Sequence, residues 1–287
     1  MDGQIKGMFR VWTRCSAAAA GALWLVAGAQ SGRADVISSV SQFKNIASLQ
    51  TGNGNTLSGN GTFFSTDLTS NDGTFTTVTM TYPGAGSPVS LTSSGPVDYL
   101  FQTPSLADKA TMDAAFPFGT YQVSASGSGT GSTSYSYAAD DYAQANPFLT
   151  GTDYSSLQGM DPSHPFTFHL SPYTNAGTPA FSFIFLTVFD FTKGQTVFNQ
   201  GFLAPSTTSV VMPGNTLAFG DSFSYEVDYS NRDLVASPGA TFDAQLGFDL
   251  RTDGTFSSAQ AAAPEPSGML LAACGLLAGW AARRRMR

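Results

Sequence analysis

The stretch from Phe181 to Phe191, Phe-Ser-Phe-Ile-Phe-Leu-Thr-Val-Phe-Asp-Phe, decides the fold class of this chain. Aromatic and β-branched residues fill it, and these residue types are enriched in strands. It is followed at once by Lys193-Gly194, which is typical of a turn. A run this apolar predicts a buried strand, so we expect Phe181–Phe191 to be a central strand of a β-sheet.

The segments on both sides repeat the pattern of a short strand followed by a turn. Thr74–Tyr82 alternates between polar and apolar residues and ends at Pro83-Gly84. The other predicted strands are Phe118–Ser126, Pro165–Leu170, Gln195–Phe202, Thr207–Met212, Ser222–Tyr229 and Thr241–Leu250. Their number and spacing predict an all-β protein made of antiparallel β-sandwiches.

One segment departs from this pattern and predicts a short helix over residues 105–116. Ser105 can cap its start, Asp108 then lies at the third helical position, and apolar residues recur at helical spacing. Pro117 ends it, because proline cannot continue a helix.

Charge is scarce and unevenly distributed along the 287 residues. Charged residues make up 11% of the chain, against about 25% in ordinary globular domains. Eight of the 13 basic residues lie in the two end segments, so the body keeps five basic and 18 acidic residues, a net charge of about −13. Such a body is repelled by nucleic acid and by anionic membrane surfaces. Its two cysteines, Cys15 and Cys274, lie in the end segments, so the body has no disulfide or thiol nucleophile.

Residues 1–34 have the pattern of a signal peptide. An apolar run from Ala17 to Ala29 follows a positive region formed by Lys6, Arg10 and Arg14. Small residues at Gly32 and Ala34 predict that signal peptidase cuts between Ala34 and Asp35. A cut after Ala29 is an alternative, and a membrane anchor or a buried helix is the alternative to a signal peptide.

Residues 259–287 form an Ala-rich linker and a tail in three parts: Pro264-Glu265-Pro266, the uncharged apolar run 268–282, and a cluster of Arg283, Arg284, Arg285 and Arg287. As a helix, the apolar run would reach roughly 22 Å, short of the ~30 Å hydrocarbon core. Local thinning of the bilayer lets it span as a single transmembrane helix. Basic residues stay on the cytoplasmic side, so the body lies outside the inner membrane.

This tail resembles the PEP-CTERM sorting signal, which exosortases recognise in Gram-negative bacteria that produce exopolysaccharide. The resemblance covers Pro264 to Arg287 and includes all three parts in order. It implies that exosortase recognises Pro264–Pro266, that the tail is cut nearby after a transient stay in the inner membrane, and that the body reaches the cell surface. An ordinary C-terminal membrane anchor is the alternative. The body also resembles uncharacterised PEP-CTERM proteins with a Phe-Pro-x-Gly-Thr-Tyr segment, here Phe116–Tyr121, a resemblance that implies no activity.

The body divides most readily at Tyr137–Pro147, just after the Gly/Ser-rich stretch 124–134. We therefore expect an N-terminal β-rich domain over 35–145 and a C-terminal β-sandwich domain over 146–258. The sequence that follows the boundary resembles the opening of immunoglobulin-like and fibronectin type III modules, which implies a fold of that kind.

Motifs for catalysis, cofactors or metals are absent from the sequence of the body. His164 and His169 are five residues apart, so on a strand they point to opposite faces and do not share a metal. Glu226 and Asp228 share a strand face, as in a glycoside hydrolase, but exposed carboxylate pairs are ordinary on strands. Three acidic segments could supply oxygen ligands to calcium, namely Asp140-Asp141, Asp228–Asp233 and Asp249–Asp253. We expect no catalytic residue, cofactor or metal.

Four tyrosines, Tyr135, Tyr137, Tyr142 and Tyr154, lie close together in a stretch rich in Ser, Gly and Asp. Aromatic faces can stack on sugar rings, so these residues are candidate glycan contacts; the alternative is that they cover the edge of the core. The leading hypothesis is a non-catalytic structural or interaction protein of the cell surface or of the exopolysaccharide matrix. A secreted carbohydrate-binding module is the second hypothesis, and a secreted glycoside hydrolase is the third.

Overall fold

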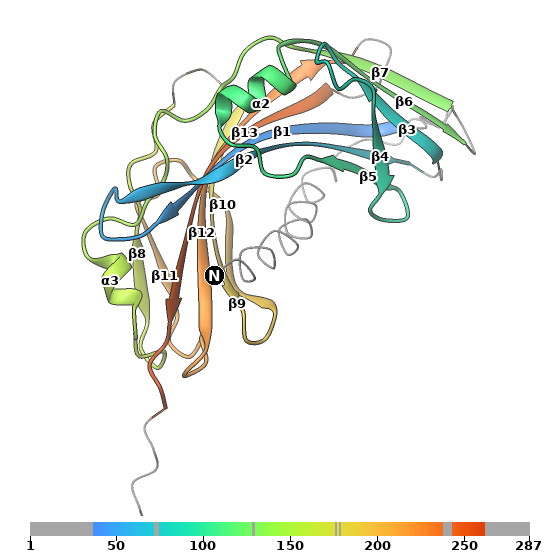
Figure 1. Cartoon of the computed structure of the whole chain (residues 1–287). Helices are drawn as coiled ribbons and strands as arrows, with labels where there is room; N and C mark the ends of the chain where they lie inside the picture. The colour runs from blue at the N-terminus through green and yellow to red at the C-terminus, as the bar shows by residue number, and fades with distance from the viewer. Residues whose placement is uncertain are drawn as a thin grey trace, which may run out of the picture.

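The computed structural model describes residues 37–71, 75–127, 130–175, 177, 179–237 and 243–261. These residues form mostly β-strands, as the sequence predicts, and two short helices, of which the sequence predicts one (Figure 1). The predicted signal peptide 1–34, its cut between Ala34 and Asp35, the sorting motif and the transmembrane run 268–282 lie outside the described residues. Neither described helix has the length and apolar composition that crossing a membrane requires.

Eleven of the strands form one sheet in the order β10-β9-β12-β13-β1-β2-β5-β4-β3-β6-β7, and β11 and β8 form a second sheet. The bounds are β1 Ile37–Gln50, β2 Leu57–Ser70, β3 Phe75–Thr81, β4 Val89–Ser93, β5 Asp98–Gln102, β6 Gly119–Gly127, β7 Thr130–Tyr137, β8 Phe166–His169, β9 Phe181–Asp190, β10 Gln195–Leu203, β11 Ser209–Met212, β12 Ser222–Ala236 and β13 Asp243–Ser257.

The first and last described strands lie side by side in the middle of the large sheet. β1 and β13 pair in parallel, with Ser41 opposite Gln245 and Leu49 opposite Asp253, whereas the other paired strands run antiparallel. Strands from both sides of residue 145 therefore share one sheet. The division into domains at 35–145 and 146–258 stays a prediction. The pairing of β1 with β13 joins the two predicted domains in one sheet.

The large sheet bends, so that β6 and β7 lie across one end of the long strands (Figure 1). A row of aromatic rings fills the space between these layers. Phe64 on β2 stacks on Phe116 at 4.0 Å between ring centroids, and Tyr121 on β6 stacks on Tyr135 of β7 at 5.8 Å. Tyr137 stacks on Phe248 of β13 at 6.0 Å, so the core runs from β2 through β7 to β13.

The small sheet of β8 and β11 covers the other end of the same face. Phe168 on β8 is fully buried and its ring lies 6.5 Å from that of Tyr225 on β12. Helix α3 (Asp153–Leu157) buries Leu157 on this side. The sheet thus has one covered face, the core face, with two smaller layers packed on it.

The predicted apolar strand is confirmed as an internal strand, since β9 pairs with β10 on one side and β12 on the other. It is the second strand from the edge of the sheet. The predicted helix is also present, but α2 spans Lys109–Ala115 and begins later than expected. Its N-cap is Asp108, whose side chain accepts a hydrogen bond from the Thr111 N–H at 2.7 Å, so the assignment of the cap to Ser105 was wrong.

Loss of the Phe64 ring should destabilise the protein strongly, because the ring is fully buried among Phe101, Phe116 and Tyr121. We expect Phe64→Ala to lower the free energy of unfolding by about 4 kcal/mol, as for other large-to-small core changes. Val211→Ala, at a position with 58% of its surface exposed, should change it by less than about 1 kcal/mol. Urea unfolding of both variants measures the difference, and equal losses would contradict this core assignment.

Candidate functional site

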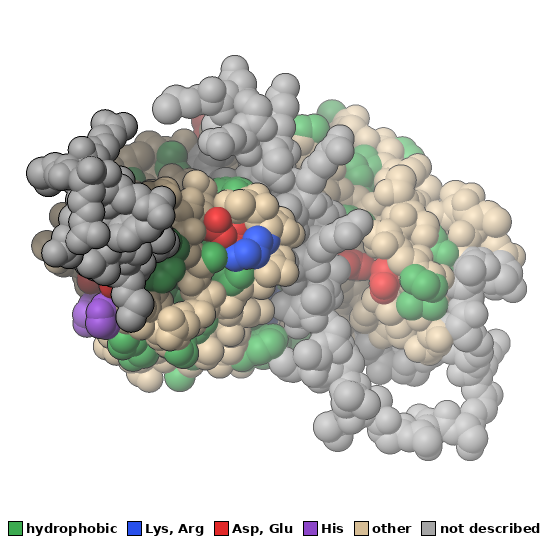
Figure 2. Space-filling model, turned by 90° about the horizontal axis from the view of Figure 1, so that it is seen from below, with side chains coloured by type: hydrophobic (Ala, Val, Ile, Leu, Met, Phe, Trp, Pro, Cys, Tyr) green, Lys and Arg blue, Asp and Glu red, His purple; other side chains and the backbone are tan. Residues whose placement is uncertain are grey.

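Most charged residues of β12 and β13 lie on the face of the sheet opposite the core, which we call the outer face. On β12, Tyr225, Val227 and Tyr229 point into the core, so the residues between them lie on the outer face. Few charged side chains are visible among the described residues on the face seen from below (Figure 2). Six residues form what we call the charged ladder: Glu226, Asp228 and Arg232 on β12, and Asp249, Arg251 and Asp253 on β13.

Ion pairs connect the charged ladder across the two strands. The Arg251 guanidinium lies 3.0 Å from a Glu226 oxygen and 2.6 Å from an Asp253 oxygen. Arg232 lies 2.5 Å from Asp249, which also accepts a hydrogen bond from the Ser230 hydroxyl. Three carboxyl groups thus share two guanidinium groups, and both cations of the ladder are paired.

In and beside the charged ladder, the side chains of Asp228 and Asn45 have polar atoms without a hydrogen-bond partner. Asp228 is 6% exposed and its Oδ1 has no partner, and Asn45 on β1 is 1% exposed with neither side-chain atom bonded. Asn45 lies opposite Asp249 in the β1–β13 register. Burial raises the pKa of Asp228 well above its usual range, and burial raises the pKa of Glu226 to about 7. These two carboxyl groups therefore hold their protons more tightly than an exposed carboxyl group does.

Phenylalanines line the ladder on its β9 side, and we call them the phenylalanine shelf: Phe181, Phe183 and Phe185 on β9, and Phe202 on β10. Phe185 lies directly opposite Asp228 in the β9–β12 register. The Phe202 ring lies 5.1 Å from the rings of both Phe183 and Phe185, and 44% of its surface is exposed. Phe185 thus lies between the exposed Phe202 ring and Asp228.

Gly247 on β13 allows Arg232 to join the shelf to β1. The Arg232 guanidinium carbon lies 4.9 Å from the Phe43 ring centre and 5.0 Å from that of Phe183. A Cβ atom at Gly247 would come within 2.3 Å of the Phe43 ring and 2.9 Å of the guanidinium. Only glycine at this position therefore leaves room for the cation to lie between the two rings.

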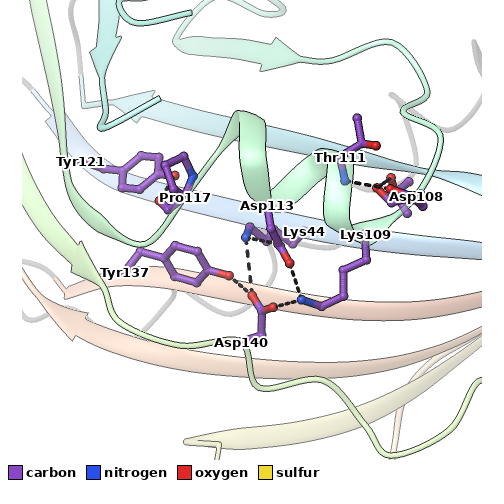
Figure 3. Close-up of polar contacts among 10 residues, drawn as sticks. Lys44, Asp108, Lys109, Thr111, Asp113, Pro117, Tyr121, Tyr137 and Asp140 are labelled. Carbon is purple, nitrogen blue, oxygen red and sulfur yellow. Dashed lines mark hydrogen bonds and ion pairs between the residues drawn. The ribbon is translucent and has the colours of Figure 1, made fainter. Parts of the chain in front are cut away.

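A second ionic cluster lies on the core face and fastens α2 to the sheet (Figure 3). Lys44 of β1 is 1% exposed, and its ammonium group lies 2.7 Å from Asp113 of α2 and 4.4 Å from the Tyr137 ring centre. Lys109 binds the same Asp113 and also Asp140, which accepts a hydrogen bond from the Tyr137 hydroxyl. Every one of these groups has a partner, so we assign the cluster a structural role.

Three of the four tyrosines predicted as glycan contacts lie in the core. Tyr135 and Tyr137 are 1% exposed and Tyr142 is 9% exposed, and their rings pack on other protein rings. The Tyr135 hydroxyl donates to Gln42 at 2.9 Å. Tyr154 is half-buried beside the core. Their burial fits the alternative interpretation, in which these tyrosines cover the core, and leaves no free ring face on the first three.

The remaining candidates from the sequence are also placed. His164 and His169 are exposed beside Asp161 and Asp153, and among the described residues no group of three His, Cys, Asp or Glu side chains could hold a metal ion. Glu226 and Asp228 do share a face, as their spacing predicts. The sequence did not single out Arg232, Arg251 or the phenylalanine shelf as a site. The one usable signal was the alternation of charged and apolar residues in β12 and β13.

No family of known proteins matches the chain, and no similar curated protein was found. Three solved structures are similar over much of this chain: the BSP domain of a biofilm-associated protein (14% identity, 79% of this chain, TM-score 0.21), the FN1–FN3 domains of chicken CNTN1 (13%, 70%, 0.23), and trypsin-activated alpha-2-macroglobulin from Escherichia coli (11%, 80%, 0.23). This chain spans 30%, 64% and 16% of their respective lengths. At such identities and TM-scores, the similarity carries no functional argument.

Removing the Lys44 ammonium should destabilise the protein, because it leaves Asp113 and Asp140 with one cation instead of two. We expect Lys44→Ala to lower the free energy of unfolding by about 3 kcal/mol, the range for breaking a buried ion pair. Lys109→Ala removes a cation that is 42% exposed and should cost less than about 1 kcal/mol. Chemical denaturation compares the two, and a larger loss for Lys109→Ala would overturn the structural role of Lys44.

Asp67 on β2 should make stability fall as pH rises. Burial, followed by repulsion from Asp98, raises the pKa of Asp67 to about 6, and its Oδ1 has no hydrogen-bond partner. The unfolded state therefore releases this proton more readily, so stability is lost between about pH 4 and pH 6. We expect Asp67→Asn to remove that loss and to stabilise the protein by about 2 kcal/mol at pH 7. Asp243→Asn, at an exposed position, is the control. Urea unfolding of the wild type and both variants at about pH 4 and pH 7 measures the change in stability. If the wild type and Asp67→Asn lose the same stability between these pH values, Asp67 ionises in the folded protein without cost and the prediction is wrong.

Proposed function

We propose that this chain is an exported, non-catalytic protein of the cell surface or of the exopolysaccharide matrix. In this proposal, signal peptidase removes residues 1–34, and exosortase processes the tail at Pro264–Pro266. The apolar run 268–282 holds the protein in the inner membrane until that cut. An immunoglobulin- or fibronectin-like identity of the C-terminal half belongs to the same proposal.

The observation that carries the proposal is the position of the folded body between the two predicted cuts. β1 begins at Ile37, two residues after Asp35, and Ile37 already pairs with Ser70 of β2. At the other end, the Ser258 N–H donates to Asp221 and the Ala259 N–H to Met160, and Pro264 follows five residues later. Cuts at both predicted positions would thus leave every described strand whole.

The net negative charge of the body also supports the proposal that it binds neither anionic membrane surfaces nor nucleic acid. Its five basic residues, Lys44, Lys109, Lys193, Arg232 and Arg251, are all in ion pairs with carboxylates. A body with about 13 excess negative charges and no unpaired cation among these five repels polyanions.

Processing can be tested by producing the full chain in a host that has an exosortase and in the same host without it. We expect a soluble mature form that starts near Asp35 and ends near Pro264 in the first host, and a membrane-bound form that retains Arg287 in the second. Intact-mass analysis of the membrane and soluble fractions measures this.

The sorting motif is tested in the exosortase host. Glu265→Ala should keep the tail attached, whereas Ala262→Ser in the preceding linker should be processed normally. If the wild-type protein keeps its tail in both hosts, the proposal fails and the protein is a membrane-anchored one.

A carbohydrate-binding role is the second candidate function. The phenylalanine shelf favours it, because exposed aromatic rings beside carboxyl groups suit sugar rings and their hydroxyls. A glycoside hydrolase would need Glu226 and Asp228 to act on a bound sugar. Arg251 already binds Glu226, so we do not favour hydrolysis over binding.

A further inference from the structure

We propose that the phenylalanine shelf and the charged ladder together form a binding site for an uncharged, hydroxyl-rich polysaccharide. This inference rests on the proposed export to an exopolysaccharide matrix and identifies the partner of the protein there. In the site, the Phe202 ring stacks on one sugar ring of the polysaccharide, and Asp228 and Asn45, on strands farther along the sheet, bond to hydroxyls of other sugar units of the same chain.

The backbone at Phe202 is the first observation behind this site. Phe202 has φ of 56°, a left-handed conformation that is a genuine outlier for a bulky side chain. The strained conformation holds the ring against Phe183 and Phe185 while 44% of its surface stays exposed. Such strain persists where the surrounding structure imposes it, and it concentrates at sites that bind ligands.

The unpartnered oxygen of Asp228 is a second, independent observation. Asp228 is nine-tenths buried, lies opposite Phe185 in the sheet, and leaves its Oδ1 without a hydrogen bond. Asn45, two strands away on the same face, leaves both an acceptor and a donor unused. Buried polar atoms are nearly always bonded, so these three atoms mark places where a ligand hydroxyl completes the bonding.

The charges of the site select an uncharged partner. Arg232 and Arg251 are already paired within the ladder, so neither is available for a carboxylate or sulfate group of an acidic polysaccharide. The ladder carries two more acidic than basic groups, and this excess of acidic groups disfavours an anionic polysaccharide. The position of the site also argues against a peptide that binds by adding a strand to the sheet. Such a peptide needs a sheet edge, whereas this site lies mostly on internal strands.

Affinity electrophoresis of the purified full chain tests the site. The native gels contain a soluble glucan, a mannan or a xylan, with alginate as the anionic and chitosan as the cationic comparison. We expect at least one uncharged polysaccharide to retard the protein, with little effect of salt on the retardation.

Three variants locate the binding. Phe202→Gly removes the ring and relieves the strain at φ 56°, so it should weaken binding about tenfold or more while the melting temperature stays unchanged or rises. Asp228→Val keeps a side chain suited to a strand but removes the acceptor, and should also weaken binding. Phe219→Ala is the matched control, because Phe219 has the same 44% exposure and lies outside the site.

The inference is overturned if no uncharged polysaccharide binds, if only alginate or chitosan binds, or if Phe202→Gly binds as tightly as the wild type. Processing of the wild-type chain in the exosortase host is measured in parallel. A wild-type chain that is processed normally but binds no uncharged polysaccharide defeats this inference alone, whereas a wild-type chain that binds but is not processed defeats the proposed function alone.

Discussion

The parallel pairing of β1 with β13 is the constraint on which the rest of the structure depends. It joins the first and last described strands in the middle of an eleven-stranded sheet. The inward face of β1 is largely polar, and each polar group there finds a partner from another layer. Gln42 accepts from the Tyr135 hydroxyl, and Gln50 accepts from the Tyr225 hydroxyl at 2.7 Å and from the Leu149 N–H at 2.9 Å. Satisfied polar networks of this kind fix one register, since a shift would leave several buried groups unbonded.

β1 also contributes to both of the polar clusters of the body, one on each face of the sheet. Lys44 points from β1 into the core and fastens α2, while Asn45, its neighbour in sequence, points to the outer face beside Asp249. Alternation along one strand thus separates a structural ionic cluster from the candidate binding face. The core cluster uses all its charges internally. The outer face has an unbonded Asp228 oxygen and an exposed Phe202 ring, and this difference is the physical reason for assigning binding to it.

The sequence predicts the β class, the internal position of Phe181–Phe191 and the helix at 105–116, because each depends on local pattern. It does not predict β1, since the polar inward residues of that strand lack the alternation that marks a buried strand. The buried tyrosines were misleading for a related reason. Tyr135 and Tyr137 lie among Ser and Gly residues, which are typical of a surface. Their hydroxyls nevertheless bond to protein groups: Tyr135 to Gln42, which is distant in sequence, and Tyr137 to Asp140, which no sequence pattern identifies as its partner. The candidate site depends on the β9–β12–β13 register, which pattern alone does not determine.

The topology also bears on the proposed processing. In the proposed export, β13 would be the last described strand to cross the membrane, and it pairs with both β12 and β1, its most distant partner in sequence. Such non-local pairing is slow compared with the formation of local hairpins. If the tail holds the chain at the membrane, as proposed, the body has time to insert β13 before release. Only five residues of sequence separate Ala259 from Pro264, so in the proposed processing the enzyme would cut close to the last strand of the folded body.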